Sequence, residues 1–202
     1  MDILDSLFRS EKTYLASIQP LVQPTVNGVL GVKTYPVTNK TIPCLFWRGG
    51  ISKSMISDKN KADISAAILL RPSDISVQEI PTTCRICIKD NSFNKYINKV
   101  TNYSAGALTI EIDGFDDSRK PIKKGDTFTI ATETGSPEHT ISAVILVNGI
   151  TGSITFTPAL ASTVLNNAPV TITPVLGYYS IIYPDNIANQ DQVIMLPVKE
   201  FI

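Results

Sequence analysis

The sequence has little charge, few cysteines and no long hydrophobic run, and each shortage excludes a class of protein. Only 18% of its 202 residues are charged, and 18 basic residues balance 18 acidic ones. A chain without net charge has no general electrostatic attraction to nucleic acid or to an anionic membrane. Its longest apolar runs, such as residues 144–147 and 66–70, fall far short of the roughly 20 residues that span a bilayer. The sequence therefore predicts no membrane contact.

The first residues also lack the pattern of a secretory signal. Residues 1–8 contain two acidic residues and no basic residue ahead of an apolar block. We therefore expect the protein to fold in a cytoplasm, where its three cysteines stay reduced.

Short segments in which apolar and polar residues alternate fill the chain from about residue 41 onward. Such alternation is typical of half-buried strands. The clearest five form an apparent β-module, with Asn148-Gly149 and similar pairs as turns: residues 107–112, 126–131, 139–147, 152–157 and 169–173. Further strands are predicted at residues 42–47, 64–71, 82–89, 178–183 and 193–196.

The N-terminal segments differ from these strands. In residues 2–18 apolar side chains recur every three or four positions and Pro20 follows, which predicts an amphipathic helix. This helix packs on its own chain or docks on a neighbouring subunit; its candidate docking residues are Leu4, Leu7, Phe8 and Leu15. Prolines and glycines in residues 20–43 indicate an irregular or extended connector, whose strands would be edges.

The predicted fold class is therefore mainly β. We expect a β-barrel or sandwich core with one N-terminal α-helix and an inserted or appended small β-domain. The expected parts are a helix over residues 1–20, a β core over 21–100 and 174–202, and the β-module over 101–173. Residues 51–64 are polar and predict a mobile loop.

Residues capable of chemistry are present but do not form a recognisable catalytic or metal-binding motif. Cys84 and Cys87 have the C-x-x-C spacing of a zinc ligand pair, but a second pair is missing and alternation places the two on opposite faces of a strand. We expect both to be buried. His139, the only histidine, has no nucleophile in a recognisable turn beside it, so we expect a solvated or hydrogen-bonded histidine at a strand end.

Two further clusters, one of aspartates and one of aromatic residues, could either bind a ligand or have a structural role. Asp113, Asp116 and Asp117 could bind calcium, yet the basic residues at 119–124 follow them directly and favour a solvated hairpin loop. Trp47 and the tyrosines at 178, 179 and 183 could form a ligand platform, but favour core packing or a subunit interface. We predict no cofactor, no metal and no enzymatic activity.

The order of several of these segments resembles the head–tail joining proteins of tailed bacteriophages, also called head completion or stopper proteins. The resemblance rests on Asp2–Phe8 as an opening helix, Ile42–Trp47 as a strand before the polar loop, and Ser65–Ile75 as a strand with a short connector. Lys124-Gly-Asp-Thr-Phe-Thr-Ile130 is similar to a strand opening found in that family and in other virion proteins. The chain is longer than usual for the family, which implies an enlarged or inserted β-domain.

This resemblance implies a structural role in the virion after assembly in the host cytoplasm. Subunits of the family form a ring, commonly of six copies, between the portal or its adaptor and the tail. The ring closes the DNA channel, so a non-specific contact with packaged DNA is expected. The candidate channel or gating loop comprises Ser52, Lys53, Asp58, Lys59, Asn60 and Lys61.

Two other functions fit the same β-rich chain. A capsid or tail decoration protein would present the module at 101–173 outward. A carbohydrate-binding β-sandwich would use Trp47 or the tyrosines at 178–183.

Overall fold

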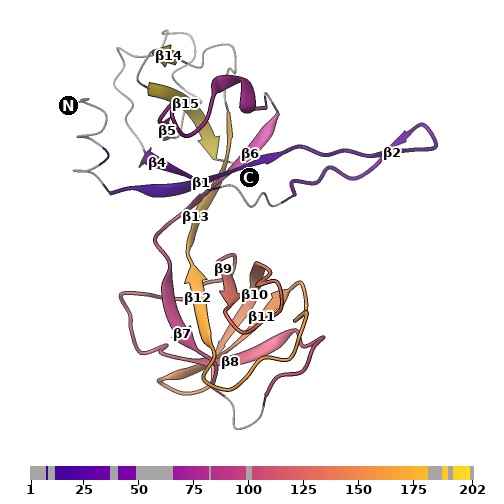
Figure 1. Cartoon of the computed structure of the whole chain (residues 1–202), viewed down its shortest axis with the longest axis vertical. Coiled ribbons are helices and arrows are strands. Elements are labelled where there is room, and N and C mark those ends of the chain that lie inside the picture. The colour runs from indigo at the N-terminus through magenta and orange to yellow at the C-terminus, as the bar shows by residue number, and fades with distance from the viewer. Residues whose placement is uncertain are drawn as a thin grey trace. The chain divides into compact units, whose positions relative to one another are not determined.

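The computed structural model describes residues 8, 12–36, 41–48, 66–81, 83–98, 102–181, 188–190 and 193–200. The chain divides into two compact units: unit 1 comprises Met1–Lys89 and Leu176–Ile202, and unit 2 comprises Asp90–Val175 (Figure 1). Both are built from strands, and none of the elements in the described residues is an α-helix. The described part of the chain accordingly contains no helix long and apolar enough to cross a membrane.

Unit 1 is a closed antiparallel barrel. Six strands follow each other in the order β13-β6-β1-β4-β5-β15, and a further pairing of β15 with β13 completes the ring. Their bounds are β1 Tyr14–Pro20, β4 Thr41–Arg48, β5 Ala66–Leu70, β6 Cys84–Lys89, β13 Val175–Ile181 and β15 Val193–Glu200, with β14 Ala188–Gln190 paired to β15 outside the ring. Closure leaves no open sheet edge in the ring itself.

The barrel core is filled by aliphatic side chains from all six strands. Ile18, Ile42, Ile68, Ile86 and Leu196 are among the buried residues of one continuous cluster. A short 3₁₀ helix, η2 Val77–Glu79, connects β5 to β6. Burial alternates over the first four residues of β4, whereas β5 is a continuous apolar run that is buried at four of its five positions.

Unit 2 is inserted in the connection between two neighbouring barrel strands, β6 and β13. Its six-stranded antiparallel sheet has the order β7-β12-β9-β10-β11-β8. The bounds are β7 Phe93–Tyr96, β8 Thr109–Asp113, β9 Thr127–Ile130, β10 His139–Leu146, β11 Thr151–Thr157 and β12 Pro169–Thr173. The two outer strands also meet, because Ile97, just beyond β7, forms a bridge with Ile112 of β8.

The five strands predicted for the β-module are all present in unit 2. Burial alternates along most of β8, β11 and β12. Buried residues of the five strands, such as Ile110, Phe128, Ile154 and Ile172, belong to one core. The sixth strand, β7, was not predicted. Between β11 and β12, Val164 pairs with Tyr103 in an isolated bridge.

The helix predicted over residues 2–18 is wrong in its second half. Residues 14–20 form β1, which pairs with β4 on one side and β6 on the other. Pairing along both edges and burial of Ala16 and Ile18 outweigh the helical spacing of the apolar residues. Leu15, a candidate docking residue, is therefore a half-buried strand residue.

Candidate functional site

Among the described residues of unit 1, a hairpin arm lies outside the barrel. The arm runs from Val22 to Thr34, which bridge each other at its base, and contains the strand pair β2 Thr25–Val26 and β3 Val29–Leu30. Figure 1 shows it extending away from the barrel. The sequence had predicted only an extended or irregular connector here.

The hairpin shape of the arm follows from a tight turn at its tip and from hydrogen bonds between its two sides. Its turn has Asn27 at φ 52° and Gly28 at φ 78°, two positive values in succession that Asn-Gly adopts in tight hairpin turns. The Gly31 N–H donates to the Pro24 carbonyl at 2.7 Å, and the Gln23 side-chain amide donates to the Gly31 carbonyl at 3.0 Å. The Asn-Gly pair between two β-type dipeptides was the sequence signal for this hairpin.

The base of the arm is anchored to the barrel through Arg85 of β6. The Arg85 guanidinium lies over the Tyr35 ring at 4.9 Å and over the Tyr178 ring at 4.2 Å. Its Nε donates to the Oε1 of the buried Gln19 at 2.8 Å. Guanidinium stacking on two rings is a favourable cation–π arrangement, so the base of the arm is fixed while its tip reaches solvent.

The arm presents an apolar surface that, apart from Lys33 at its base, is uncharged. Val29, Leu30 and Val32 are 69%, 67% and 80% exposed, and no charged residue occurs between Lys12 and Lys33. Exposed apolar groups gathered on one element mark an interaction surface more often than isolated ones do.

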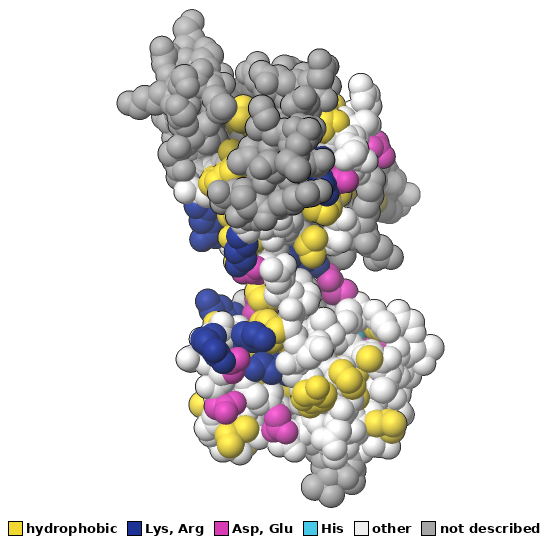
Figure 2. Space-filling view, turned by 60° about the vertical axis from the view of Figure 1, so that its left-hand side comes forward, with side chains coloured by type: hydrophobic (Ala, Val, Ile, Leu, Met, Phe, Trp, Pro, Cys, Tyr) yellow, Lys and Arg dark blue, Asp and Glu magenta, His cyan; other side chains and the backbone are white. Residues whose placement is uncertain are grey.

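Unit 2 carries a second surface of the same kind, at the turn between β10 and β11. Four aliphatic residues there are more than half exposed: Ile145, Leu146, Val147 and Ile150. Asn148 holds the predicted turn, since its Oδ1 accepts the N–H groups of Ile150 and Thr151 at 2.9 and 2.8 Å. Figure 2 shows hydrophobic side chains exposed on the face of unit 2 that it presents.

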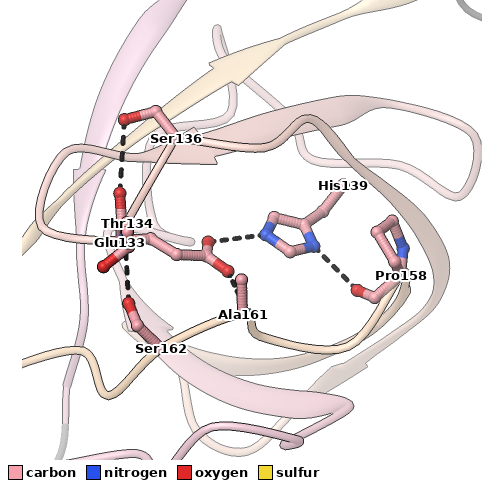
Figure 3. Close-up of polar contacts among 7 residues, drawn as sticks. All are labelled: Glu133, Thr134, Ser136, His139, Pro158, Ala161 and Ser162. Atoms are coloured by element: carbon pink, nitrogen blue, oxygen red, sulfur yellow. Dashed lines mark hydrogen bonds and ion pairs between the residues drawn. The ribbon is translucent and has the colours of Figure 1, made fainter.

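The sole histidine lies in a sealed polar network inside unit 2 (Figure 3). His139 Nε2 is 2.6 Å from Glu133 Oε2, and His139 Nδ1 is 2.7 Å from the Pro158 carbonyl oxygen. The other Glu133 oxygen accepts the Ala161 N–H at 2.6 Å. Both side chains are fully buried, and the imidazole packs between the rings of Phe128 and Phe156.

The geometry settles what this pair does. A carbonyl oxygen only accepts, so Nδ1 must carry a hydrogen, and a single further proton is shared between Nε2 and Glu133. Every strong hydrogen-bonding position of the pair is thus used inside the protein. The network joins the turn at 131–138 to the segment at 158–162, so it stabilises the fold. The sequence left open whether His139 is solvated or hydrogen-bonded at a strand end. The structure shows it buried and hydrogen-bonded at the start of β10. Glu133 was not predicted as its partner.

The Gly-Asp pair of the virion-like segment has a structural explanation. Gly125 adopts φ 94°, and the buried Asp126 carboxylate accepts the N–H groups of Lys123 at 2.8 Å and Val175 at 3.0 Å. Burial raises the pKa of Asp126, against the opposing effect of these two donors. Asp126 therefore connects the start of β9 to the last residue of unit 2.

All three cysteines are buried free thiols. Cys84 lies in the barrel core, whereas Cys87 lies outside that cluster, as alternation along the strand predicts. Burial raises the pKa of Cys44 to about 12 and that of Cys84 to about 11.

We expect these thiols to be unreactive in the native protein. At pH 8 a thiol with a pKa near 12 is only ~10⁻⁴ ionised, and the thiolate is the reacting form. A maleimide titration should therefore find essentially no labelling until denaturant is added, and three labels per chain afterwards. Rapid labelling at pH 8 without denaturant would contradict the burial of these residues.

Two of the three carboxylates at the end of β8 and in the following turn have partners within the protein. Asp113 Oδ1 accepts the Asn98 side-chain amide at 2.7 Å and the Thr151 hydroxyl at 2.9 Å, and Asp117 pairs with Arg119. Lys95 donates to the Gly114 carbonyl. Among the described residues no group of three or more histidine, cysteine or acidic side chains is arranged to hold a metal ion.

The aromatic residues considered as a platform are spread over different environments. Tyr179 is buried in the barrel core and its hydroxyl accepts the Arg48 Nε–H at 3.1 Å. Tyr178 lies under Arg85, and Trp47 is partly exposed on β4. Tyr183 lies outside the described residues.

Of the remaining candidate residues, only Phe8 belongs to the described part of the chain. Phe8 is buried against Leu45 and Leu69, with the Arg71 guanidinium over its ring at 4.8 Å. Leu4, Leu7 and the whole candidate channel loop at 51–64 lie outside the described residues. Their proposed roles stay predictions from the sequence.

Comparison with known proteins adds no relative. No model of a protein family matches the chain, and no curated protein matches its sequence.

Proposed function

We propose that this protein is a structural component of the neck of a tailed phage. In this role a homo-oligomeric ring of the chain, with six copies as the expected number, stands between the portal or adaptor and the tail. The ring closes the DNA channel and provides the surface on which the tail docks. Portal, adaptor and tail proteins are its partners, and packaged DNA touches it without sequence preference.

The observation that carries the proposal is the character of the described surface. Two apolar elements, the arm as far as Val32 and the β10–β11 turn, are exposed and carry no charge. The buried titratable groups Glu133, His139 and Asp126, by contrast, hold loops together. Exposed apolar elements on a well-packed scaffold suit a protein that works through contacts with other subunits. The segment Lys124–Ile130, which resembles a virion-protein motif, contributes the Asp126 contacts of unit 2.

The channel role agrees with the charge of the chain. A net charge of zero gives little attraction for phosphates, so a ring of such subunits would let DNA slide instead of gripping it. A basic lining would release counterions and hold the DNA in place.

The proposal is tested by deleting the gene from the phage that encodes it and imaging the lysate by electron microscopy. We expect separate tails beside heads that have lost their DNA, and restoration of joined particles by the gene supplied in trans. Complete, stable virions in the deletion would refute the neck function and favour a decoration role. Joined particles that fail only in host attachment would favour carbohydrate binding.

A further inference from the structure

The hairpin arm has a fixed base and an apolar tip that no side chain among the described residues of its own unit covers. A two-stranded ribbon is at best marginally stable in water, and β2–β3 exposes Val29, Leu30 and Val32 along with the ribbon itself. Covering these side chains with another surface would remove apolar area from water and stabilise the hairpin. The arm is therefore expected to be covered in the working assembly.

We propose that the arm docks on a second copy of this chain and forms the subunit contact of the homo-oligomer. The proposal rests on the proposed function and names the element that joins its subunits.

Charge favours a second copy as the occupant. The arm is uncharged between Lys12 and Lys33, so it fits an uncharged surface, and the chain itself provides one at Ile145–Val147 and Ile150. From Glu138 to Asp185 the sequence contains no acidic or basic residue other than His139, which is buried. Two copies with zero net charge do not repel each other.

The arm is smaller than one side of an ordinary stable interface. Stable interfaces use about 20–30 residues on each side, and the arm comprises only Val22–Thr34. In a closed ring with head-to-tail contacts each subunit gives one arm to one neighbour and receives another arm from the other. Each subunit is then held by two neighbours, so a ring can persist although each single contact is small.

The test compares the sedimentation velocity of the wild-type chain with that of Leu30→Asp over a range of concentrations. We expect the wild type to associate and Leu30→Asp to sediment as a monomer at the same concentrations. Ser118→Asp, which adds the same charge at an exposed position of unit 2, should associate like the wild type. Unchanged tryptophan fluorescence of Trp47 in β4 would show that the barrel of the variant is folded.

A second measurement detects weak association. A Leu30→Cys variant labelled with a benzophenone maleimide carries the photoreactive group at position 30 alone, since the native thiols are buried. Irradiation of mixed light- and heavy-isotope copies should give covalent dimers containing one chain of each kind. A monomeric wild type without such dimers, or a Leu30→Asp variant that associates like the wild type, would overturn the proposal. Because purified protein suffices, the result is independent of the gene deletion that tests the neck function.

Discussion

Replacing Glu133 by alanine is expected to lower the free energy of unfolding of unit 2 by about 3–5 kcal/mol. Removing one member of a buried pair leaves the other without its partner in a site that water does not reach. Here the change would leave both His139 Nε2 and the Ala161 N–H without their hydrogen-bond partner. It would also leave a cavity between the turn at 131–138 and the segment at 158–162.

A conservative variant separates hydrogen bonding from mere volume. In Glu133→Gln the amide oxygen still accepts the Ala161 N–H, and the amide nitrogen donates to Nε2 of a neutral histidine whose Nδ1–H stays on Pro158. Because every group keeps a partner, the loss should stay near ~1 kcal/mol. A loss in Glu133→Gln as large as that in Glu133→Ala would show that the shared proton, and not the hydrogen-bond pattern, stabilises the pair.

The measurement must tell the two units apart. Trp47 is the only tryptophan and belongs to unit 1, so its fluorescence during urea unfolding follows the barrel. Hydrogen exchange of peptides from β9 to β12 reports unit 2. We expect Glu133→Ala to speed exchange in unit 2 and to leave the fluorescence midpoint unchanged. Unchanged exchange in unit 2 would refute a stabilising role for the pair.

Replacing Asp126 by alanine should destabilise unit 2 by about 3 kcal/mol. The Lys123 and Val175 N–H groups would both lose their acceptor, and a buried donor without a partner costs about 1–3 kcal/mol. The Thr171→Ala change, at a half-buried position of β12 where a hydroxyl donates to Asn94, serves as a control with a smaller expected loss. Hydrogen exchange around 123–130 and at 175 would detect the loss locally; protection equal to that of the wild type would contradict it.

The raised pKa of Asp126 also predicts a pH dependence. A carboxyl whose pKa is higher in the folded than in the unfolded state contributes stability below its unfolded pKa and loses that contribution as the pH rises through the folded value. The advantage of the wild type over Asp126→Asn should therefore shrink between about pH 3 and pH 7. Urea unfolding of both proteins across this range checks the sign, and an advantage that grows with pH would contradict it.

The strands of unit 2 were predictable because two local signals agreed there. The sequence of β8, β11 and β12 alternates between apolar and polar residues, as their burial does. The Asn148-Gly149 turn marks where β10 ends and β11 begins. The first barrel strand was not predictable in the same way. Apolar residues at 14, 15 and 18 fit a helix as well as a strand, and only the partners Thr41–Cys44 and Cys84–Lys89 decide between them.

The contacts of the polar groups depend on the folded chain. Glu133 lies in a turn six residues before His139, and no spacing rule connects a turn residue to a strand residue across a core. Asp126 accepts from Val175, which is 49 residues further along the chain. The arm, by contrast, carried the Asn27-Gly28 signal, which the surrounding prolines obscured.

The place at which unit 2 enters the chain has an evolutionary consequence. Its first residue, Asp90, donates its N–H to the carbonyl of Pro174 at 2.9 Å, so its two ends lie side by side. A short turn joining β6 to β13 would span the same gap, which makes unit 2 an exchangeable cassette. A lineage could acquire, replace or discard it while the barrel keeps its strand pairings.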